Sequence, residues 1–491
     1  MAQNPIKSLA GQTVVYGMGT ILPRLLNYFM VPLYTRVFER EVYGQVTELY
    51  AYVAFFMVLL TYGMETAFFR YAQKHEARKV FNTAMSAITL TSAVFLVLLG
   101  AFYLPVSSWM QYEGNPEYIL FIGLIVTVDV LTAIPFAMLR KLNQARRFAV
   151  VKLLNVSANI GLNLIFIVFI PGLSASFSDV IFGNGPDLLV WVLISNIAAS
   201  ILSLAMLAPL FRTFRFSMDL SLLRPMLHYA LPVLVVGVAG MVNEVIDKIL
   251  LKYLLPDAGQ AMAQLGVYGA NYKLGVLMTL FVQMFRYASE PFFFAEAEKK
   301  NAPELFARVM NYFVLSGLMI FLMVVLYLDL FKHFIGQDYH EGLGIVPIVL
   351  MANLFYGIFY NLSIWYKLTD RTGDGAYISI AGAVVTITLN ILLIPVLGYH
   401  GAAWAHFGCY FLMMGASYIW GQKVFPIPYQ TRRIVFYILV AAVLYFISTV
   451  VQEQNAWLKY SVNTFLFGLF TFVAYWLEIR KAAAAPPAGR G

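Results

Sequence analysis

The chain has 491 residues, of which 61% are hydrophobic and only 12% are charged. Soluble proteins carry about 25% charged residues, so this composition, with a mean hydropathy of +0.75, excludes an ordinary soluble protein and indicates many membrane spans. The net charge of +8 does not indicate nucleic-acid binding, because membrane proteins retain Lys and Arg in cytoplasmic loops. A single cysteine excludes an intramolecular disulfide.

Fourteen apolar segments follow one another along the chain, each close to the length of about 20 residues that crosses a bilayer. They cover residues 9–33, 43–68, 80–104, 117–139, 147–170, 187–210, 224–251, 264–289, 305–328, 342–365, 375–395, 400–420, 433–451 and 458–477. No cleavable signal peptide is expected before the first segment. The sequence therefore predicts an all-α polytopic membrane protein with 14 transmembrane helices.

The basic residues predict the orientation of these helices. If the N-terminus is cytoplasmic, 24 of the 33 Lys and Arg residues fall in cytoplasmic segments and five, including Lys252, fall in external ones. Such an excess on one side is typical of the cytoplasmic face. We therefore expect both termini in the cytoplasm and the chain in a bacterial inner membrane.

Two segments recur along the chain and predict an internal duplication. "VYGQVTELYAYVAFFMVLLTYGMETAFF" is similar to "VYGANYKLGVLMTLFVQMFRYASEPFFF", and at their offset of 225 residues Glu65 falls on Glu290. "LNLIFIVFIPGL" is similar to "LNILLIPVLGYH" at an offset of 227, which places Arg140 on Lys367. Chance similarity between apolar segments is the alternative. Because six helices separate the copies, the repeat should be parallel, with a central cavity between two six-helix lobes.

The repeat predicts the domain organisation. The N-terminal lobe should cover residues 1–221 and the C-terminal lobe residues 222–425. Two extra helices at residues 426–481 lie outside the repeat, and a disordered tail at residues 482–491 follows them.

Basic residues inside the spans are candidates for substrate binding, because a charge at the bilayer centre is costly and faces a cavity or a partner. Apart from the residues counted above with the cytoplasmic and external segments, four lie within the predicted spans: Arg24, Lys248, Lys273 and Arg286. Together they indicate an anionic substrate, although snorkelling of the side chain to the membrane surface would by itself explain Arg286.

Acidic residues inside the spans are candidates for ion coupling. Asp129 lies near the middle of the fourth segment, where burial would favour its protonated form. In "MVNEVIDKILLKYLL", Glu244 and Lys248 are four residues apart and can pair along one helix face. A purely structural role is the alternative both for this patch and for Asp129. The coupling candidates are Asp129, Glu244, Asp247 and Glu48.

Several kinds of chemistry have no motif in this chain. There is no G-x-x-x-x-G-K-[ST] sequence, so we expect no ATP hydrolysis. The six histidines are scattered and lack the spacing of metal ligands. We therefore expect no cofactor, no metal and no catalytic residue.

The segments "YTRVFEREVYGQVTELYAYVAFFMVLLTYGMETAFFRY", "IPFAMLRKLNQARRFA" and "LNILLIPVLGYHGAAWA" resemble polysaccharide-biosynthesis flippases of the Wzx type, in the MOP exporter superfamily. The resemblance covers most of the first twelve predicted helices. It implies two six-helix lobes around a cavity. It also implies transfer of an undecaprenyl-diphosphate-linked oligosaccharide, such as an O-antigen unit, from the cytoplasmic to the outer leaflet. Relatives of this kind hold the diphosphate with cavity Arg and Lys residues.

Other functions remain open at this point. A cation-coupled multidrug exporter would prefer acidic cavities, and a lipid II flippase is disfavoured by Glu48 at mid-depth of the second helix. A membrane-bound polymerase or ligase would need a large external loop, which the sequence lacks. We expect lipid-linked oligosaccharide, membrane lipids and other glycan-assembly proteins as partners, no nucleic acid, and a monomer. The two extra helices are predicted to form a groove for the polyprenyl tail.

Overall fold

The computed structural model describes residues 17, 19–170, 187–212, 214–450 and 455–484. Within these ranges the regular structure is helical and contains no strand. Eleven helices are long and apolar enough to cross a membrane, and a pair of helices bent by 49° adds a twelfth. The all-helical polytopic fold is thus confirmed for the described residues, while the count of fourteen spans stays a prediction. The predicted external loop at 171–186 lies outside the described residues.

The chain divides into two compact units, called unit 1 (Met1–Gly266) and unit 2 (Val267–Gly491). The boundary falls inside helix α12 (Ala258–Leu274), so that α11 (Leu220–Leu254) belongs to unit 1. The predicted lobes, which meet between residues 221 and 222, remain a proposal.

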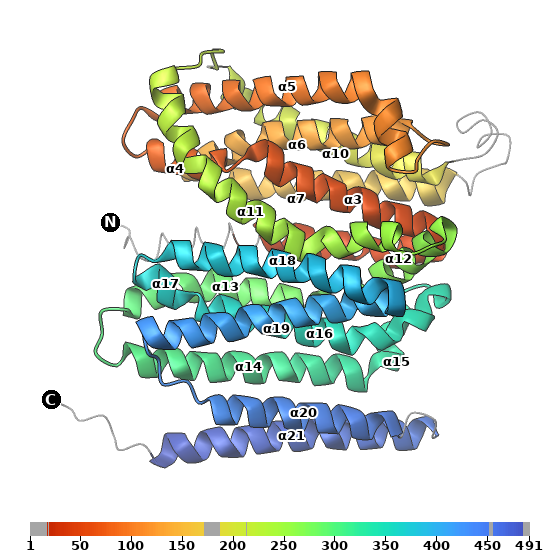
Figure 1. Ribbon diagram of the computed structural model, residues 1–491, viewed down its shortest axis with the longest axis vertical. Helices are drawn as coiled ribbons and strands as arrows, with labels where there is room; N and C mark the ends of the chain where they lie inside the picture. Colours follow the sequence, from red (N-terminus) through yellow and green to blue (C-terminus); the bar gives the residue numbers. More distant parts are fainter. Residues whose placement is uncertain (1–16, 18, 171–186, 213, 451–454, 485–491) are drawn as a thin grey trace. The chain divides into compact units, whose positions relative to one another are not determined.

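Unit 1 is built around helix α6, whose apolar window is 61% buried, against 17% to 39% for the other spans of this unit. Helix α6 contacts α3, α4, α5, α7 and α10, and Figure 1 shows these helices running alongside one another. The helices of unit 1 are α2 (Met30–Val37), α3 (Arg40–Thr61), α4 (Met64–Tyr71), α5 (Ala77–Trp109), α6 (Glu117–Lys141), α7 (Ala145–Leu164), the π-helix η1 (Ile165–Phe169), α10 (Leu188–Phe211) and α11.

A sharp turn separates α3 from α4 within the second predicted span. Tyr62 and Gly63 both adopt positive φ angles, of 35° and 71°, which only glycine adopts without strain. A side chain at Gly63 would also meet the Ala230 carbonyl oxygen of α11 at 2.6 Å. Glycine at this position therefore allows both the turn and the close approach of α11.

Unit 2 is built around the span from Gln337 to Leu368, which contains α16 and whose apolar window is 78% buried. Helix α16 contacts α13, α14, α17, α19 and η3. The helices of unit 2 are α13 (Val276–Glu296), α14 (Ala302–Leu326), α15 (Leu328–Phe331), the 3-10 helices η2 (Lys332–Phe334) and η3 (Gln337–Ile345), α16 (Val346–Leu362), α17 (Ile364–Leu368), α18 (Thr372–Leu397), α19 (Tyr399–Val424), α20 (Thr431–Val450) and α21 (Ala456–Ala484).

The two extra C-terminal helices, α20 and α21, contact each other and α14, and they lie beside α14 in Figure 1. Asn463 Nδ2 donates to the Leu326 carbonyl at 2.6 Å, and the Tyr327 and Thr464 hydroxyls lie 2.8 Å apart. These polar contacts attach the pair to one end of α14. Trp457 and Phe446 remain 84% and 71% exposed, as expected of helices that face lipid.

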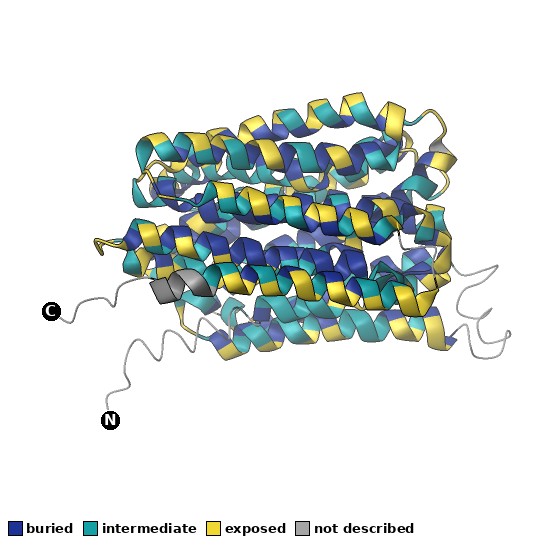
Figure 2. Ribbon diagram, turned by 90° about the horizontal axis from the view of Figure 1, so that it is seen from below, coloured by how far each residue is buried: buried dark blue, intermediate teal, exposed yellow. Residues whose placement is uncertain are grey.

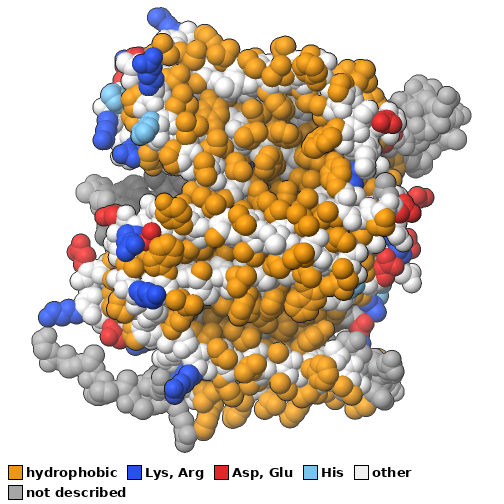
Figure 3. Space-filling model, viewed as in Figure 1, with side chains coloured by type: hydrophobic (Ala, Val, Ile, Leu, Met, Phe, Trp, Pro, Cys, Tyr) orange, Lys and Arg blue, Asp and Glu red, His pale blue; other side chains and the backbone are white. Residues whose placement is uncertain are grey.

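The surface follows the pattern of a protein that spans a bilayer. Buried residues line the inner faces of the helices, whereas exposed residues lie on their outer faces (Figure 2). Apolar side chains cover the length of the helices and charged side chains gather at the helix ends (Figure 3). In lipid the backbone must satisfy its own hydrogen bonds, so helices with this distribution are the expected solution.

Candidate functional site

The most deeply buried charged group is Glu48, in the first half of α3 in unit 1. It is 0% exposed, and its Oε2 atom accepts hydrogen bonds from Lys252 Nζ at 3.0 Å and from the Tyr112 hydroxyl at 2.6 Å. Lys252 Nζ also donates to the Met110 carbonyl at 2.6 Å and lies 4.0 Å from the centre of the Tyr112 ring. We call Glu48, Lys252, Tyr112 and Met110 the unit 1 clasp.

The clasp corrects one sequence assignment. Lys252, placed in an external loop from sequence, lies inside α11 and is 3% exposed. Its identity as the partner of Glu48 was missed because the two residues are far apart along the chain and share no motif. Burial and the neighbouring Glu48 carboxylate raise the pKa of the Tyr112 phenol well above its usual range. Tyr112 therefore stays protonated and donates to Glu48.

Asp129 has neighbours on two other helices of unit 1. The Ser200 hydroxyl of α10 and the Lys152 ammonium of α7 both lie near enough to its carboxylate to affect it electrostatically. Lys152 Nζ lies 4.1 Å from the centre of the Phe136 ring, so this lysine points into the helix bundle. The sequence analysis had counted Lys152 only as a cytoplasmic charge.

Of the four predicted binding cations, three are exposed: Arg24, Lys273 and Arg286. Arg24 belongs to unit 1, whereas Lys273 and Arg286 belong to unit 2. The substrate-binding role of these three cations stays a prediction.

The fourth cation, Lys248, is engaged on its own helix. Its Nζ atom lies 3.2 Å from Asp247 Oδ1 and donates to the Glu244 backbone carbonyl at 2.8 Å. Asp247 is only 1% exposed, whereas the Glu244 carboxylate is exposed. Lys248 therefore contacts the Asp247 side chain and the Glu244 backbone carbonyl, whereas the helical spacing had suggested the Glu244 carboxylate.

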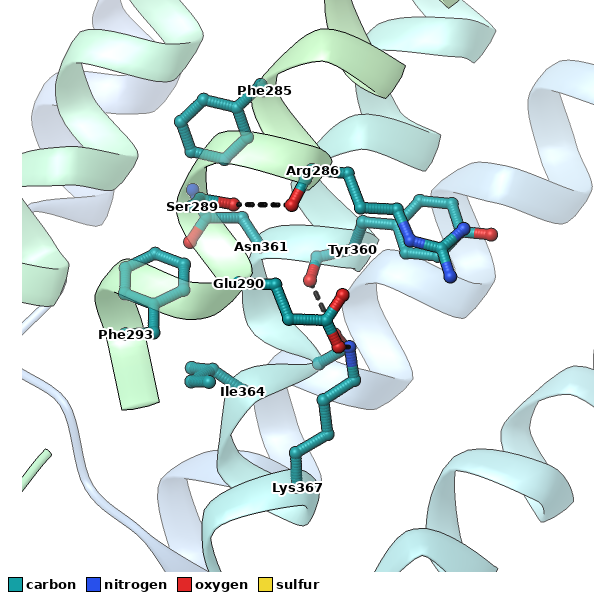
Figure 4. A pocket seen from close by; sticks show the side chains of 10 residues that line it. Phe285, Arg286, Ser289, Glu290, Phe293, Tyr360, Asn361, Ile364 and Lys367 are labelled. Carbon is teal, nitrogen blue, oxygen red and sulfur yellow. Dashed lines mark hydrogen bonds and ion pairs between the residues drawn. The ribbon is translucent and has the colours of Figure 1, made fainter. Parts of the chain in front are cut away.

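Arg286 lines a pocket in unit 2, at the end of α13 that the orientation predicts to be cytoplasmic (Figure 4). The centre of a water molecule can occupy about 20 Å³ of this pocket, which opens to solvent within about 300 Å³ of unoccupied space. The Arg286 guanidinium carbon lies over the Tyr360 ring, 4.5 Å from its centre. The remaining lining residues are Phe285, Ser289, Glu290, Phe293, Asn361, Ser363, Ile364 and Lys367.

An ion pair joins two of the helices that line this pocket, α13 and α17. Lys367 Nζ of α17 donates to Glu290 Oε1 of α13 at 2.8 Å, and the two side chains are 23% and 41% exposed. In Figure 4 the Glu290 carboxylate points toward Lys367, on the same side of the pocket as Arg286. The sequence analysis noted Glu290 and Lys367 only as repeat positions and not as site residues.

Unit 1 contains an ion pair at the corresponding repeat positions. Arg140 of α6 pairs with Glu65 of α4, and the proposed offsets of 225 and 227 place these residues on Glu290 and Lys367. The most buried spans of the two units, α6 and the span containing α16, also correspond at the second offset. These correspondences support the proposed duplication.

No group of three or more metal-ligating side chains occurs among the residues that the structure describes. Arg286, Glu290 and Lys367 instead form a charged pocket that suits an anion, because two cations and only one carboxylate line it. Such charge-assisted contacts favour phosphate and carboxylate ligands.

The fold and these charged spans define a helical polytopic membrane protein. A sequence profile of the family described as "Polysaccharide biosynthesis protein" matches residues 9–297. This match covers more than half of the chain, so the chain belongs to the polysaccharide biosynthesis protein family.

Solved structures of low sequence identity share the fold. The "Lipid II flippase MurJ, inward closed conformation" is 14% identical and superposes with a TM-score of 0.67, over 95% of this chain and 100% of that one. An inward-facing multidrug resistance MATE family transporter of the MOP superfamily is 14% identical, with a TM-score of 0.58 over 84% and 97% of the two chains. An outward-facing MATE transporter is 15% identical, with a TM-score of 0.56 over 86% and 96%. No curated protein matches the chain.

Proposed function

We propose that the protein moves an undecaprenyl-diphosphate-linked oligosaccharide from the cytoplasmic to the outer leaflet of a bacterial inner membrane by alternating access. The observation that carries this proposal is the polysaccharide biosynthesis family match. The exposed Arg286 above Tyr360 supports it, because a cation held in a pocket can bind a diphosphate. The substrate-binding residues of the proposal are Arg24, Lys248, Lys273 and Arg286.

Transport of surface glycan in a deletion strain tests this function. Arg24→Ala and Lys273→Ala should each abolish export while the protein still inserts, because each removes an exposed cation from a span. Arg36→Ala is the matched control, since Arg36 is an exposed arginine on α2 whose side chain donates to the Pro32 carbonyl. Normal surface glycan from both test variants at wild-type protein levels would reject their role.

A lipid II flippase and a multidrug exporter are the competing functions, since both kinds of protein share this fold. Drug susceptibility, lipid II transfer and surface glycan, measured in the same deletion strain, separate the three. Loss of surface glycan alone is the outcome that the proposal requires.

Asp129 is the proposed ion-coupling residue, with Glu244, Asp247 and Glu48 as further candidates. Its carboxylate lies in a span near Lys152 and Ser200, where binding and release of a proton could accompany movement of the lobes. Asp129→Asn should bind substrate but lose pH-gradient-driven transport in proteoliposomes. Ser200→Ala keeps the carboxylate and should retain it. Gradient-dependent transport at the wild-type rate in Asp129→Asn would remove this residue from the mechanism.

Helices α20 and α21 are proposed to form, with α14, a groove for the polyprenyl tail. Their attachment to α14 and their exposed apolar side chains support this role. Crosslinking of a photoreactive polyprenyl substrate tests it. Labels confined to the first six predicted helices would count against the groove.

A further inference from the structure

Two cations and one carboxylate line the same pocket of unit 2. Glu290 accepts a hydrogen bond from Lys367 at 2.8 Å. Arg286 lies one helical turn earlier on α13 and lines the same pocket. The three side chains therefore carry a net charge of about +1 in one pocket. An anion that replaced Glu290 would meet two cations at once.

Exposure makes this exchange physically reasonable. The Glu290 and Lys367 side chains are 41% and 23% exposed, so their ion pair is stabilised only weakly against water. A phosphate could therefore replace the carboxylate without first dehydrating a buried charge. The unit 1 clasp differs, because the side chains of Lys252 and Glu48 are only 2% and 0% exposed.

The same pocket is lined by an unsatisfied amide, that of Asn361 (Figure 4). Asn361 is 2% exposed, and neither its Nδ2 nor its Oδ1 has a hydrogen-bond partner among the described residues. Buried polar groups are nearly always paired, so this amide should contact a water molecule or a ligand hydroxyl.

The corresponding position in unit 1 lacks both features. The Arg140 and Glu65 side chains are 35% and 39% exposed, so this pair resembles the unit 2 pair in exposure. At the proposed offsets, however, Arg286 and Asn361 correspond to Thr61 and Ile134. Unit 1 therefore has the ion pair without a cation or an amide at these two positions.

From this asymmetry we propose that Arg286 and Lys367 form a phosphate-binding site, and that Glu290 is an internal counter-ion which the diphosphate of a lipid-linked substrate displaces. This inference rests on the proposed function and names the residues of one binding step. Glu290 keeps the two cations neutralised while the site is empty. It competes with the bound phosphate and so promotes its release.

Binding of undecaprenyl diphosphate to the full-length protein in phosphatidylethanolamine nanodiscs tests the proposal. Lys367→Met should weaken binding at least about tenfold, because one charge-assisted contact is lost. Glu290→Gln should tighten binding several-fold and slow dissociation, because the competing charge is removed while the side chain can still accept a hydrogen bond from Lys367.

The matched controls are Arg140→Met and Glu65→Gln, which change the corresponding pair of unit 1 and should leave affinity unchanged. A Glu290→Gln variant that binds more weakly, as a merely structural residue would, overturns the proposal. Equal weakening by Lys367→Met and Arg140→Met overturns it as well. Thermal unfolding of each variant identifies any loss of binding that comes from misfolding.

Inorganic pyrophosphate forms a second arm of the experiment. If pyrophosphate competes with the lipid and Lys367→Met abolishes this competition, the site binds the phosphate itself. If no variant changes the affinity for the lipid, the proposed site is rejected. These binding measurements do not depend on transport. If the deletion strain exports glycan normally, the proposed function fails while the contrast between Glu290→Gln and Lys367→Met can still stand.

Discussion

The Glu48–Lys252 pair of unit 1 and the Glu290–Lys367 pair of unit 2 have the same chemistry in opposite surroundings. The first is buried: the Tyr112 hydroxyl donates to Glu48 Oε2 and the Met110 carbonyl accepts from Lys252, while Glu48 Oε1 has no hydrogen-bond partner among the described residues. The second opens into a pocket next to Arg286. Burying both charges is costly, so removal of one partner leaves an uncompensated charge in a dry environment. In the half-exposed pair water can replace either partner. Burial therefore makes the first pair a structural contact and leaves the second available for exchange.

The largest effect should come from breaking the buried pair. We expect Lys252→Met to lower the free energy of unfolding by about 3–5 kcal/mol, because the Glu48 carboxylate stays buried without its cation. Denaturation in mixed micelles measures this change. The double variant Glu48→Gln with Lys252→Met should recover much of the loss, since no net charge then remains. A double variant as unstable as the single one would show that packing, rather than charge, holds the clasp together.

A smaller effect should follow from removing one hydrogen bond of the clasp. Tyr112→Phe keeps the ring beneath the Lys252 ammonium but removes the hydroxyl that donates to Glu48 at 2.6 Å. The expected loss is about 1.5–3 kcal/mol, the range for a hydrogen bond to a charged group. Tyr253→Phe, which removes a hydroxyl 3.2 Å from that of Tyr52 and leaves the ion pair intact, is the control and should cost less. The same denaturation measurement compares the two.

The exchangeable pair should contribute little to stability. Lys367→Met is expected to change the free energy of unfolding by less than about 1 kcal/mol, as is usual for exposed ion pairs. The same variant should nevertheless lose undecaprenyl diphosphate binding. A destabilisation as large as that of Lys252→Met would erase the distinction between the two pairs.

The smallest effect concerns an ion pair in the connection between α10 and α11, outside the spans. Lys79 Nζ lies 2.6 Å from Asp219 Oδ2, and its hydrogen bond lowers the pKa of Asp219 below the usual value of about 3.9. Because the folded pKa is the lower one, the stabilisation is complete above about pH 4 and is lost as the pH falls through the folded pKa. The stability difference between wild type and Asp219→Asn should shrink below about pH 4. A difference that is independent of pH would contradict this assignment.

The sequence predicted the fold well because its signals are local. The mean hydropathy and the apolar segments predicted a polytopic helical protein, and helices satisfy their own backbone in lipid. The segments that the structure describes are helical, although α19 is not among the helices apolar enough to count as a span. The 225-residue offset also predicted that Glu65 corresponds to Glu290. Each of these glutamates forms an ion pair, with Arg140 and Lys367 respectively, and these two cations correspond at the 227-residue offset.

The candidate sites were predicted less completely. Intramembrane charge identified Arg24, Arg286, Asp129 and Glu48 as unusual, since the cost of a buried charge depends on residue type and span position alone. It did not identify Lys252 as the partner of Glu48, because this residue lies near the end of an apolar segment and looks like a loop lysine.

The sequence by itself determined the membrane class, the helical fold, the duplication hypothesis and the set of costly charges, because periodicity and hydrophobicity act over short stretches of chain. Only the tertiary structure decided which charges are buried and which remain open to a ligand. That outcome depends on residues brought together from distant helices. Tyr112 and Lys252 donate hydrogen bonds to the buried Glu48, whereas Arg286 and Asn361 line a pocket together with Glu290. The same pair of residue types thus acquires different chemistry through desolvation, which no single segment encodes.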